Sequence, residues 1–151
     1  MPNQHTVEES TRAAINELLR NDAHLLITDN SERAIANRLG RYLENNFPEW
    51  DVDCEYNRNG DAVKRLIYAV EPNGNASERD VIPDIIVHHR GTDENLIAFE
   101  LKKSTNNQRN GREKDLLKLQ AFKEQLGYKY AVFVSLKTGC ANPEVTEIHW
   151  I

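Results

Sequence analysis

Three side chains that could bind a metal ion and activate water stand on two neighbouring strand-like segments. Asp84 begins the first segment, and Glu100 and Lys102 lie near the end of the second. If the turn between them is centred on Thr92, residues whose numbers sum to 184 face each other, so Asp84 faces Glu100. Facing residues have Cβ atoms ~4.5–5.5 Å apart, and Lys102 points from the same face as Glu100. A register slip of one residue would put the two acids on opposite faces.

Two carboxylates directly opposed on a sheet destabilise it because like charges repel. A divalent cation removes that cost, and Mg²⁺ typically takes one or two carboxylates and keeps several waters. A bound metal lowers the pKa of its water and neutralises charge that develops on a phosphate. Lys102 could hold or deprotonate this water, or stabilise the phosphate. The alternative is that Lys102 is only a counterion for Asp84 and Glu100 on a solvated face, and the spacing alone leaves both interpretations open.

The other face of the same hairpin is apolar, so we expect it to be buried. Its members are Ile85, Val87, Ile97, Phe99 and Leu101. His88 shares the side of Asp84, ~13 Å along the strand. It is either a surface histidine near the hairpin tip or a residue that touches substrate.

Hydrophobic periodicity predicts an α/β domain with a mixed central sheet flanked by helices. Helices are expected at 7–27 and 35–47, with N-cap residues at 28–31 between them. A third helix, with Asp115 as its N-cap and Gly127 as its stop, lies between two strands and allows a parallel crossover. Strands are expected at 50–56, 65–70, 82–89, 96–102, 128–135 and 145–150, with a loop at 71–75.

The length and charge narrow the class of protein. A chain of 151 residues suits a single domain. The net charge of −5 argues against a protein that coats nucleic acid non-specifically. The apolar runs are too short to span a bilayer, no secretory signal is visible, and Cys54 and Cys140 are expected to be reduced thiols. We therefore expect a cytoplasmic protein without a membrane partner.

Basic residues concentrate directly after Glu100, with seven lysines and arginines between Lys102 and Lys123. Such a segment could bind the phosphates of a nucleic acid beside the metal site. It could equally be a solvated helix face. The residues expected to face phosphate are Lys103, Arg109, Arg112, Lys114 and Lys118.

Pro83-Asp84, a gap of fifteen residues and then Glu100-Leu101-Lys102 resemble the signature of the PD-(D/E)xK nuclease superfamily. The resemblance covers about residues 31–135 of one domain, 1–151. It implies a restriction-endonuclease-like α-β-β-β-α-β core with an extra N-terminal helix outside it. It further implies that Asp84 and Glu100 bind Mg²⁺ or Mn²⁺, that Lys102 is the catalytic lysine, and that the protein hydrolyses phosphodiester bonds in nucleic acid, with DNA the first candidate.

Glu32 is a further candidate, because many members of that superfamily carry an acid in the first core helix. At helical spacing Glu32 lies in one stripe with Ile35 and Leu39, at the edge of the expected core. It is either an outer member of the catalytic site or part of a capping box, with Asp29 as N-cap and Glu32 at N3.

Two other classes of function compete with the nuclease. The chain could be a catalytically silent module of the same fold that binds nucleic acid or a protein. It could also be a purely structural domain, which would leave the opposed carboxylates unexplained. The small size and acidic charge favour a protein that acts as a homodimer or with a partner protein.

Overall fold

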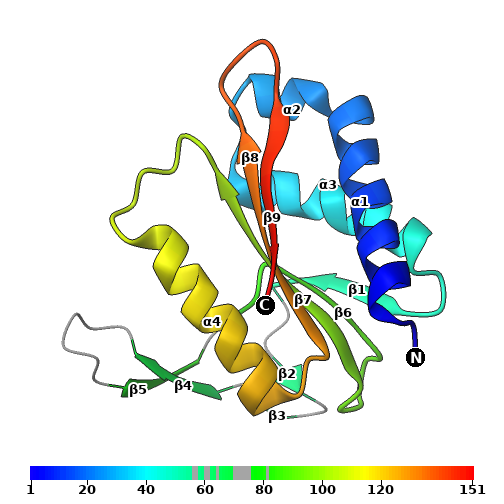
Figure 1. Ribbon diagram of the computed structural model, residues 1–151, viewed down its shortest axis with the longest axis vertical. Coiled ribbons are helices and arrows are strands. Elements are labelled where there is room, and N and C mark those ends of the chain that lie inside the picture. The colour runs from blue at the N-terminus through cyan, green and yellow to red at the C-terminus, as the bar shows by residue number, and fades with distance from the viewer. Residues whose placement is uncertain (56–57, 60–61, 64, 70–75, 81) are drawn as a thin grey trace.

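The computed structural model describes residues 1–55, 58–59, 62–63, 65–69, 76–80 and 82–151, with side chains described outside 56–81. Its centre is a five-stranded sheet in the order β1-β6-β7-β8-β9 (Figure 1). Neighbouring strands are antiparallel except β7 and β8, which are parallel. The strands are β1 (Asp51–Cys54), β6 (Ile85–His88), β7 (Asn95–Lys103), β8 (Tyr130–Lys137) and β9 (Glu144–Trp150).

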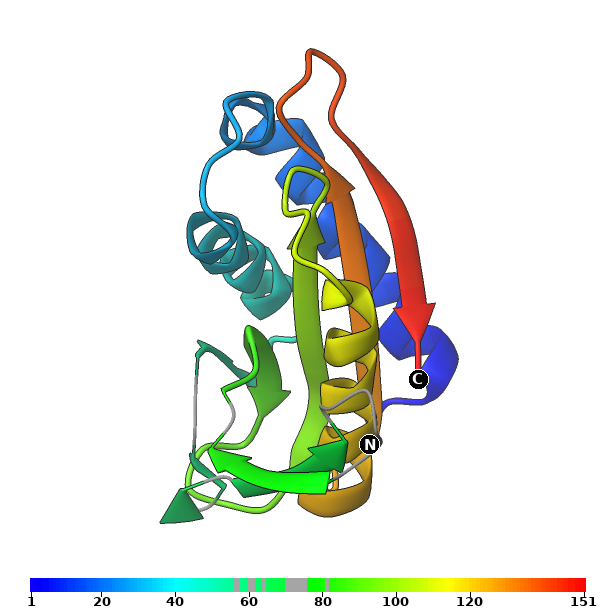
Figure 2. The same ribbon diagram turned by 90° about the vertical axis from the view of Figure 1, so that its left-hand side faces the viewer.

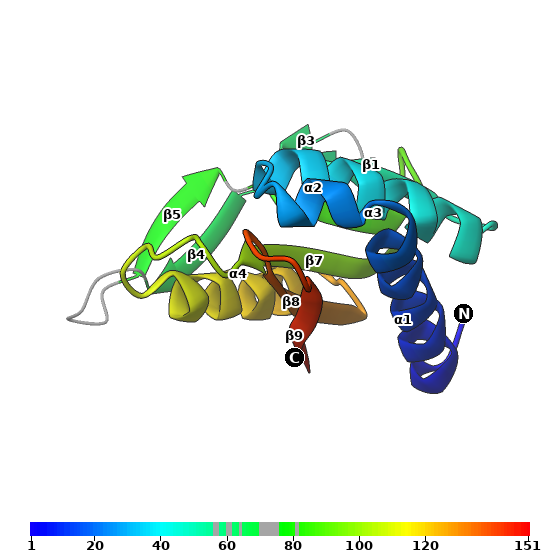
Figure 3. The same cartoon turned by 90° about the horizontal axis from the view of Figure 1, so that it is seen from above.

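Helices cover both faces of the sheet, and α3 and α4 lie on opposite sides of it (Figure 3). On one face, the odd-numbered residues of β6 and β7 pack with the apolar residues of α1 and α3. On the other, which we call the α4 face, Ile86, Ala98 and Phe133 pack with Leu119 and Phe122 of α4. The helices are α1 (Gln4–Asn21), α2 (Ala23–Ile27), α3 (Glu32–Asn46) and α4 (Gly111–Leu126).

The predicted pairing of the hairpin is confirmed. Ile85 pairs with Phe99, and the register continues through Val87 and Ile97 before it shifts at His88. The residues predicted for the apolar face are buried in the core with α1 and α3. The turn position and the alternation of side chains were therefore sufficient to set the two faces of this hairpin.

The mixed α/β sheet flanked by helices is as expected, but several boundaries differ. The helix predicted at 7–27 is divided into α1 and α2 at Asp22. Ser31, not Asp29, is the N-cap of α3, and its hydroxyl accepts a hydrogen bond from Ala34 N. The capping box with Asp29 and Glu32 is therefore wrong. Gly127 ends α4 as predicted, with the positive φ of 71° that glycine adopts without steric cost.

The region between β1 and β6 contains short strands: β2 (Arg58–Asn59), β3 (Ala62–Val63), β4 (Arg65–Ala69) and β5 (Ala76–Asp80). The strand predicted at 65–70 corresponds to β4, and β5 was not predicted. The predicted loop at 71–75 lies outside the described residues. Within the described chain, no helix has the length and apolar character needed to cross a membrane.

Candidate carboxylate–lysine site

Asp84 and Glu100 lie on the α4 face, as the sequence predicted. Asp84 stands just before β6, and its Oδ2 accepts a hydrogen bond of 2.8 Å from Leu101 N. Glu100 lies within β7 and is 2% exposed. Ile85 pairs with Phe99 at the end of β6, and Asp84, directly before Ile85, lies close enough to Glu100 for its charge to raise the pKa of that acid. The two acids therefore point to the side opposite Ile85 and Phe99.

Lys102 leaves β7 on the same face but pairs with a residue that the motif does not include. Its Nζ lies 3.0 Å from Oδ2 of Asp115, and both side chains are largely buried. Among the described residues its ion pair is with Asp115, not with Asp84 or Glu100. The interpretation of Lys102 as a counterion of the two motif acids on a solvated face is therefore wrong.

A second lysine from α4 completes the cluster. Nζ of Lys118 lies 3.0 Å from Oε1 of Glu100 and 3.9 Å from Oδ1 of Asp115. Figure 2 shows α4 running along the sheet, and it contacts both β7 and β8. The cluster thus holds three carboxylates and two ammonium groups between a strand and a helix.

Sequence reasoning missed Asp115 and the role of Lys118. The predicted N-cap at Asp115 is wrong, because α4 begins at Gly111, after Asn110 in the left-handed conformation. Asp115 lies in the second turn and is buried. The signal was present in the spacing: Asp115, Lys118 and Phe122 lie in the stripe of α4 that faces the sheet.

Electrostatics at the cluster do not favour ionised acids. Burial raises the pKa of Glu100 well above its usual range, and the nearby charge of Asp84 raises this pKa further, against the effect of Lys118. Burial also raises the pKa of Asp115, against the opposing effects of Lys102 and Lys118. Oε1 of Glu100 is buried and has no partner in hydrogen-bond geometry among the described residues, although Lys118 Nζ lies 3.0 Å away. This oxygen is therefore paired with the ammonium group but poorly hydrogen-bonded.

The donor set suits a hard divalent cation, because carboxylate oxygens are the ligands that Mg²⁺ prefers. Asp84 and Glu100 lie close together, and the buried Oε1 of Glu100 lacks a good donor. The described part of the chain has no group of three or more His, Cys, Asp or Glu side chains arranged to hold a metal. Two carboxylates are a common set for Mg²⁺, which keeps several waters.

Gly111 leaves room for the amine of Lys102 at the start of α4. A Cβ atom at Gly111 would lie 3.0 Å from Lys102 Nζ, a tighter contact than nearly all side chains make. Beside it is an open cavity of about 320 Å³, which Lys102, Gln108 and Gly111 help to line. The lysine therefore borders space that a substrate could enter.

Glu32 holds the chain directly after Lys102. Its Oε1 accepts a hydrogen bond of 2.7 Å from Asn106 Nδ2, and its Oε2 accepts one of 3.3 Å from Lys103 N. Among the contacts that the structure describes, Glu32 touches neither Asp84 nor Glu100. It links the first turn of α3 to the end of β7, so its observed role is to position the segment that follows the motif.

Three of the five basic residues predicted to face phosphate are already paired. Lys103 contacts Oδ1 of Asp29 at 3.3 Å, and Lys118 contacts Glu100. Arg112 makes two hydrogen bonds of 3.0 and 2.6 Å to Glu147. Arg109 and Lys114 are exposed and make no ion pair with the rest of the described chain.

The prediction of His88 as a surface histidine is wrong. His88 is 2% exposed. Its Nε2 lies 2.7 Å from Oδ2 of Asp53, and Arg90 binds the same carboxylate through two hydrogen bonds of 2.8 and 2.7 Å. The buried histidine belongs to a partly exposed network at the end of β6 away from Asp84.

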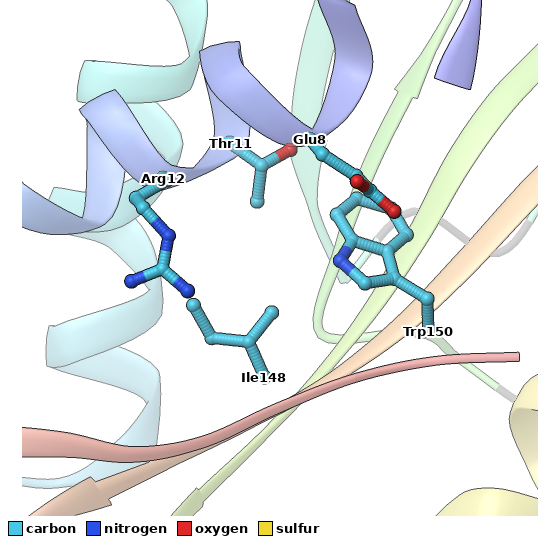
Figure 4. Close-up of a pocket in the computed structure, with 5 residues that line it drawn as sticks. All are labelled: Glu8, Thr11, Arg12, Ile148 and Trp150. Atoms are coloured by element: carbon cyan, nitrogen blue, oxygen red, sulfur yellow. The ribbon is translucent and has the colours of Figure 1, made fainter. Parts of the chain in front are cut away.

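A separate cavity of about 230 Å³ lies between α1 and β9 (Figure 4). Arg12 and Thr11 line it from the helix, and Ile148 and Trp150 line it from the strand. Ile148 and Trp150 pack against the core of α1 and α3, so this cavity lies on the opposite face of the sheet from Glu100. It contributes no residue to the carboxylate–lysine site.

No protein-family model matches the chain, and no curated protein matches its sequence. A crystal structure of SSO0001 is similar with 13% sequence identity, over 100% of this chain and 77% of that chain. Its TM-score of 0.38 is too low to establish a common fold.

Proposed function

We propose that the protein is a metal-dependent nuclease of the PD-(D/E)xK, restriction-endonuclease-like class. It would hydrolyse phosphodiester bonds in nucleic acid in the cytoplasm, with DNA as the first candidate. The observation that carries the proposal is the pair of neighbouring acids, Asp84 and Glu100, with Lys102 on the same buried face. The order α3, β1, β6, β7, α4, β8 supports it, because it contains the helices and strands that the resemblance implies.

Asp84 and Glu100 would hold Mg²⁺ or Mn²⁺ through carboxylate oxygens. When bound, the metal lowers the pKa of a water and neutralises charge on the phosphate. Leu101 N fixes Asp84, since it donates to Oδ2. Asp115 and Gly111 orient the Lys102 amine, which can hold the attacking water or stabilise negative charge on the phosphate.

Arg109 and Lys114 are the residues best placed to contact backbone phosphates, because both are exposed and unpaired within the described chain. Lys103, Arg112 and Lys118 would first have to leave their acidic partners. Each phosphate contact releases counterions, so the salt dependence of binding counts these contacts. In EDTA we expect the salt slope to correspond to about two phosphate contacts rather than five.

The test is cleavage of DNA and RNA, single- and double-stranded, by purified protein in Mg²⁺, Mn²⁺ or EDTA. The variant Lys102→Ala should lose cleavage by roughly 10²- to 10⁴-fold, the range for a group that acts in the transition state. The matched control is Lys137→Ala, at an exposed lysine at the end of β8. Cleavage that persists in EDTA or in Lys102→Ala would count against the proposal.

A second candidate is a nuclease-fold module without activity that binds nucleic acid or a protein partner, as a homodimer or in a complex. The two ion pairs, Lys102 with Asp115 and Lys118 with Glu100, favour it because they neutralise much of the site without a metal. Binding of nucleic acid in Mg²⁺ without cleavage, unaffected by Lys102→Ala, would support this candidate over the nuclease.

A further inference from the structure

We propose that Lys118 neutralises Glu100 until a divalent cation binds there. The cation displaces Lys118 from Glu100, and the released ammonium group then binds a phosphate of the nucleic acid. This inference rests on the proposed function. It assigns to one residue of α4 two roles that alternate, and it couples metal binding to substrate binding.

The amine of Lys118 lies where a metal ion would bind. Nζ of Lys118 lies 3.0 Å from Oε1 of Glu100, one of the oxygens that a metal would need. One oxygen of Asp84 accepts a hydrogen bond from Leu101 N, so the site has few free carboxylate oxygens. A metal ion on this oxygen would compete with the ammonium group, because two cations at that separation repel each other strongly where water is excluded.

The charge of the cluster also favours release of one lysine. A bound metal holds its carboxylate ligands ionised, and three ionised carboxylates with two ammonium groups carry one net negative charge. A divalent cation would turn this into one net positive charge if both lysines stayed. Release of one lysine restores neutrality, and buried charge is tolerated only where it is paired.

The two lysines differ in how firmly their amines are held. Lys102 lies between Asp115 and Gly111, a glycine that leaves space for its amine. Lys118 has no such cradle, its distance to Asp115 is 3.9 Å, and its side chain is 21% exposed. It can therefore swing toward solvent on its flexible stem. Lys114, one turn earlier on α4, is already exposed, so the two amines would form a pair of phosphate contacts.

Displacement can be read directly from the reactivity of the amine. Wild-type protein is treated with an acetylating reagent, with EDTA or with Mn²⁺, and each lysine is quantified by mass spectrometry; Mn²⁺ binding is measured separately by calorimetry. We expect Mn²⁺ to increase acetylation of Lys118 several-fold, while Lys102 stays protected and the exposed Lys114 reacts equally in both. In Glu100→Gln, Lys118 should react fast with or without Mn²⁺.

The outcomes separate the two proposals. If Mn²⁺ binds but Lys118 stays as protected as in EDTA, the displacement is overturned and the nuclease proposal stands. If Mn²⁺ does not bind the wild-type protein, both are overturned. If Glu100→Gln does not fold, the wild-type comparison still decides.

The phosphate role has its own measurement. Binding of a DNA duplex is followed against salt concentration in Ca²⁺ and in EDTA. Lys118→Gln should lower the salt slope by about one in Ca²⁺ and leave it unchanged in EDTA, because the amine contacts phosphate only after release. An equal loss in both conditions would show that Lys118 binds phosphate without displacement, and would overturn the coupling.

Discussion

Two charged clusters lie at opposite ends of β6, and they shift the pKa of an acid in opposite directions. Asp53 receives hydrogen bonds from Arg90 and His88. Although burial raises the pKa of Asp53, these partners lower it by more. At the other end, burial and the charge of Asp84 hold the pKa of Glu100 high. One cluster stabilises an ionised acid fully, and the other leaves an acid short of donors.

The difference separates a structural network from a binding site. A satisfied network stabilises the fold and has little capacity for another ligand. An acid with too few donors lowers stability and gains when a cation arrives, which is why perturbed carboxyl groups concentrate at functional sites. The predictions that follow test this distinction.

The largest contrast should come from removing one acid of each cluster. Glu100→Gln should reduce metal-dependent cleavage by about 10³-fold, because it removes a ligand and a charge, while stability stays equal or rises. Asp53→Asn should lose about 2 kcal/mol of unfolding free energy, since hydrogen bonds to a charged group are lost. Its cleavage per folded molecule should stay near that of the wild type.

Urea unfolding and initial cleavage rates, measured on the same preparations, check both variants. The comparison fails if Glu100→Gln loses stability as Asp53→Asn does, or if Asp53→Asn loses cleavage while it is folded.

Gly111→Ala should give the next largest effect. The new Cβ would push the Lys102 amine by a few tenths of an ångström, since it would lie 3.0 Å from Nζ. Misplacement of a reacting group by 1 Å can cost roughly 100-fold, so we expect a loss of about tenfold in cleavage. Stability should not fall, because alanine is the better helix former. Glu124→Ala, at an exposed residue near the other end of α4, is the control; equal activity of the two variants would show that the contact between Gly111 and Lys102 is irrelevant.

Glu32→Gln tests whether Glu32 positions the segment after Lys102. We expect its effects on stability and cleavage to be intermediate between those expected for the two clusters. The amide keeps one oxygen acceptor, so one of the hydrogen bonds to Asn106 and Lys103 N is lost. We expect about 1 kcal/mol less stability and a loss of less than tenfold in cleavage. Glu44→Gln, exposed on the same helix, is the control. A loss as large as that of Glu100→Gln would instead make Glu32 a catalytic residue.

The smallest effect is a difference in slope with pH. The pKa of Glu100 is raised above 4.5, so the native state binds the proton more tightly and stability falls as pH rises from there through the raised pKa. Glu100→Gln should lack this fall. The pKa of Asp53 is lowered below 3.8, so its contribution is present above that value and is lost as pH falls through the lowered pKa. Urea unfolding in EDTA from acid to neutral pH should show these opposite trends; parallel curves would contradict them.

The sequence was sufficient for the hairpin because its signals are local. A turn at Thr92 and strict alternation set the register, and the register set the face of Asp84 and Glu100. The strand β5, Ala76–Asp80, has no apolar alternation and was missed. The start of α4 was misplaced because Asn110 and Asp115 are both of a residue type that caps helices, and Asn110 precedes the helix in a left-handed conformation without a side-chain cap hydrogen bond.

Partners across elements were the part that the sequence did not reveal. Lys102 lies next to Glu100 on one strand, yet its amine pairs with Asp115. Which carboxylate a lysine reaches depends on where α4 packs against β7, and periodicity gives the face of a helix but not its height along a strand. For the same reason, Glu32 was predicted near the residues of the motif but with the wrong contact partners, because it binds Lys103 N and Asn106.

The parallel pairing of β7 with β8 has a consequence for how the site assembles. Parallel neighbours need a crossover connection, and α4 supplies it. The helix that returns the chain to the sheet must therefore cover one face, and it brings Asp115 and Lys118 onto the row of Glu100 and Lys102. All five charged groups lie between residues 84 and 118, so the site closes short loops and incurs little loop entropy. We expect the site to form early in folding, and the hydrogen bonds of Glu32, which is distant in sequence, to form later.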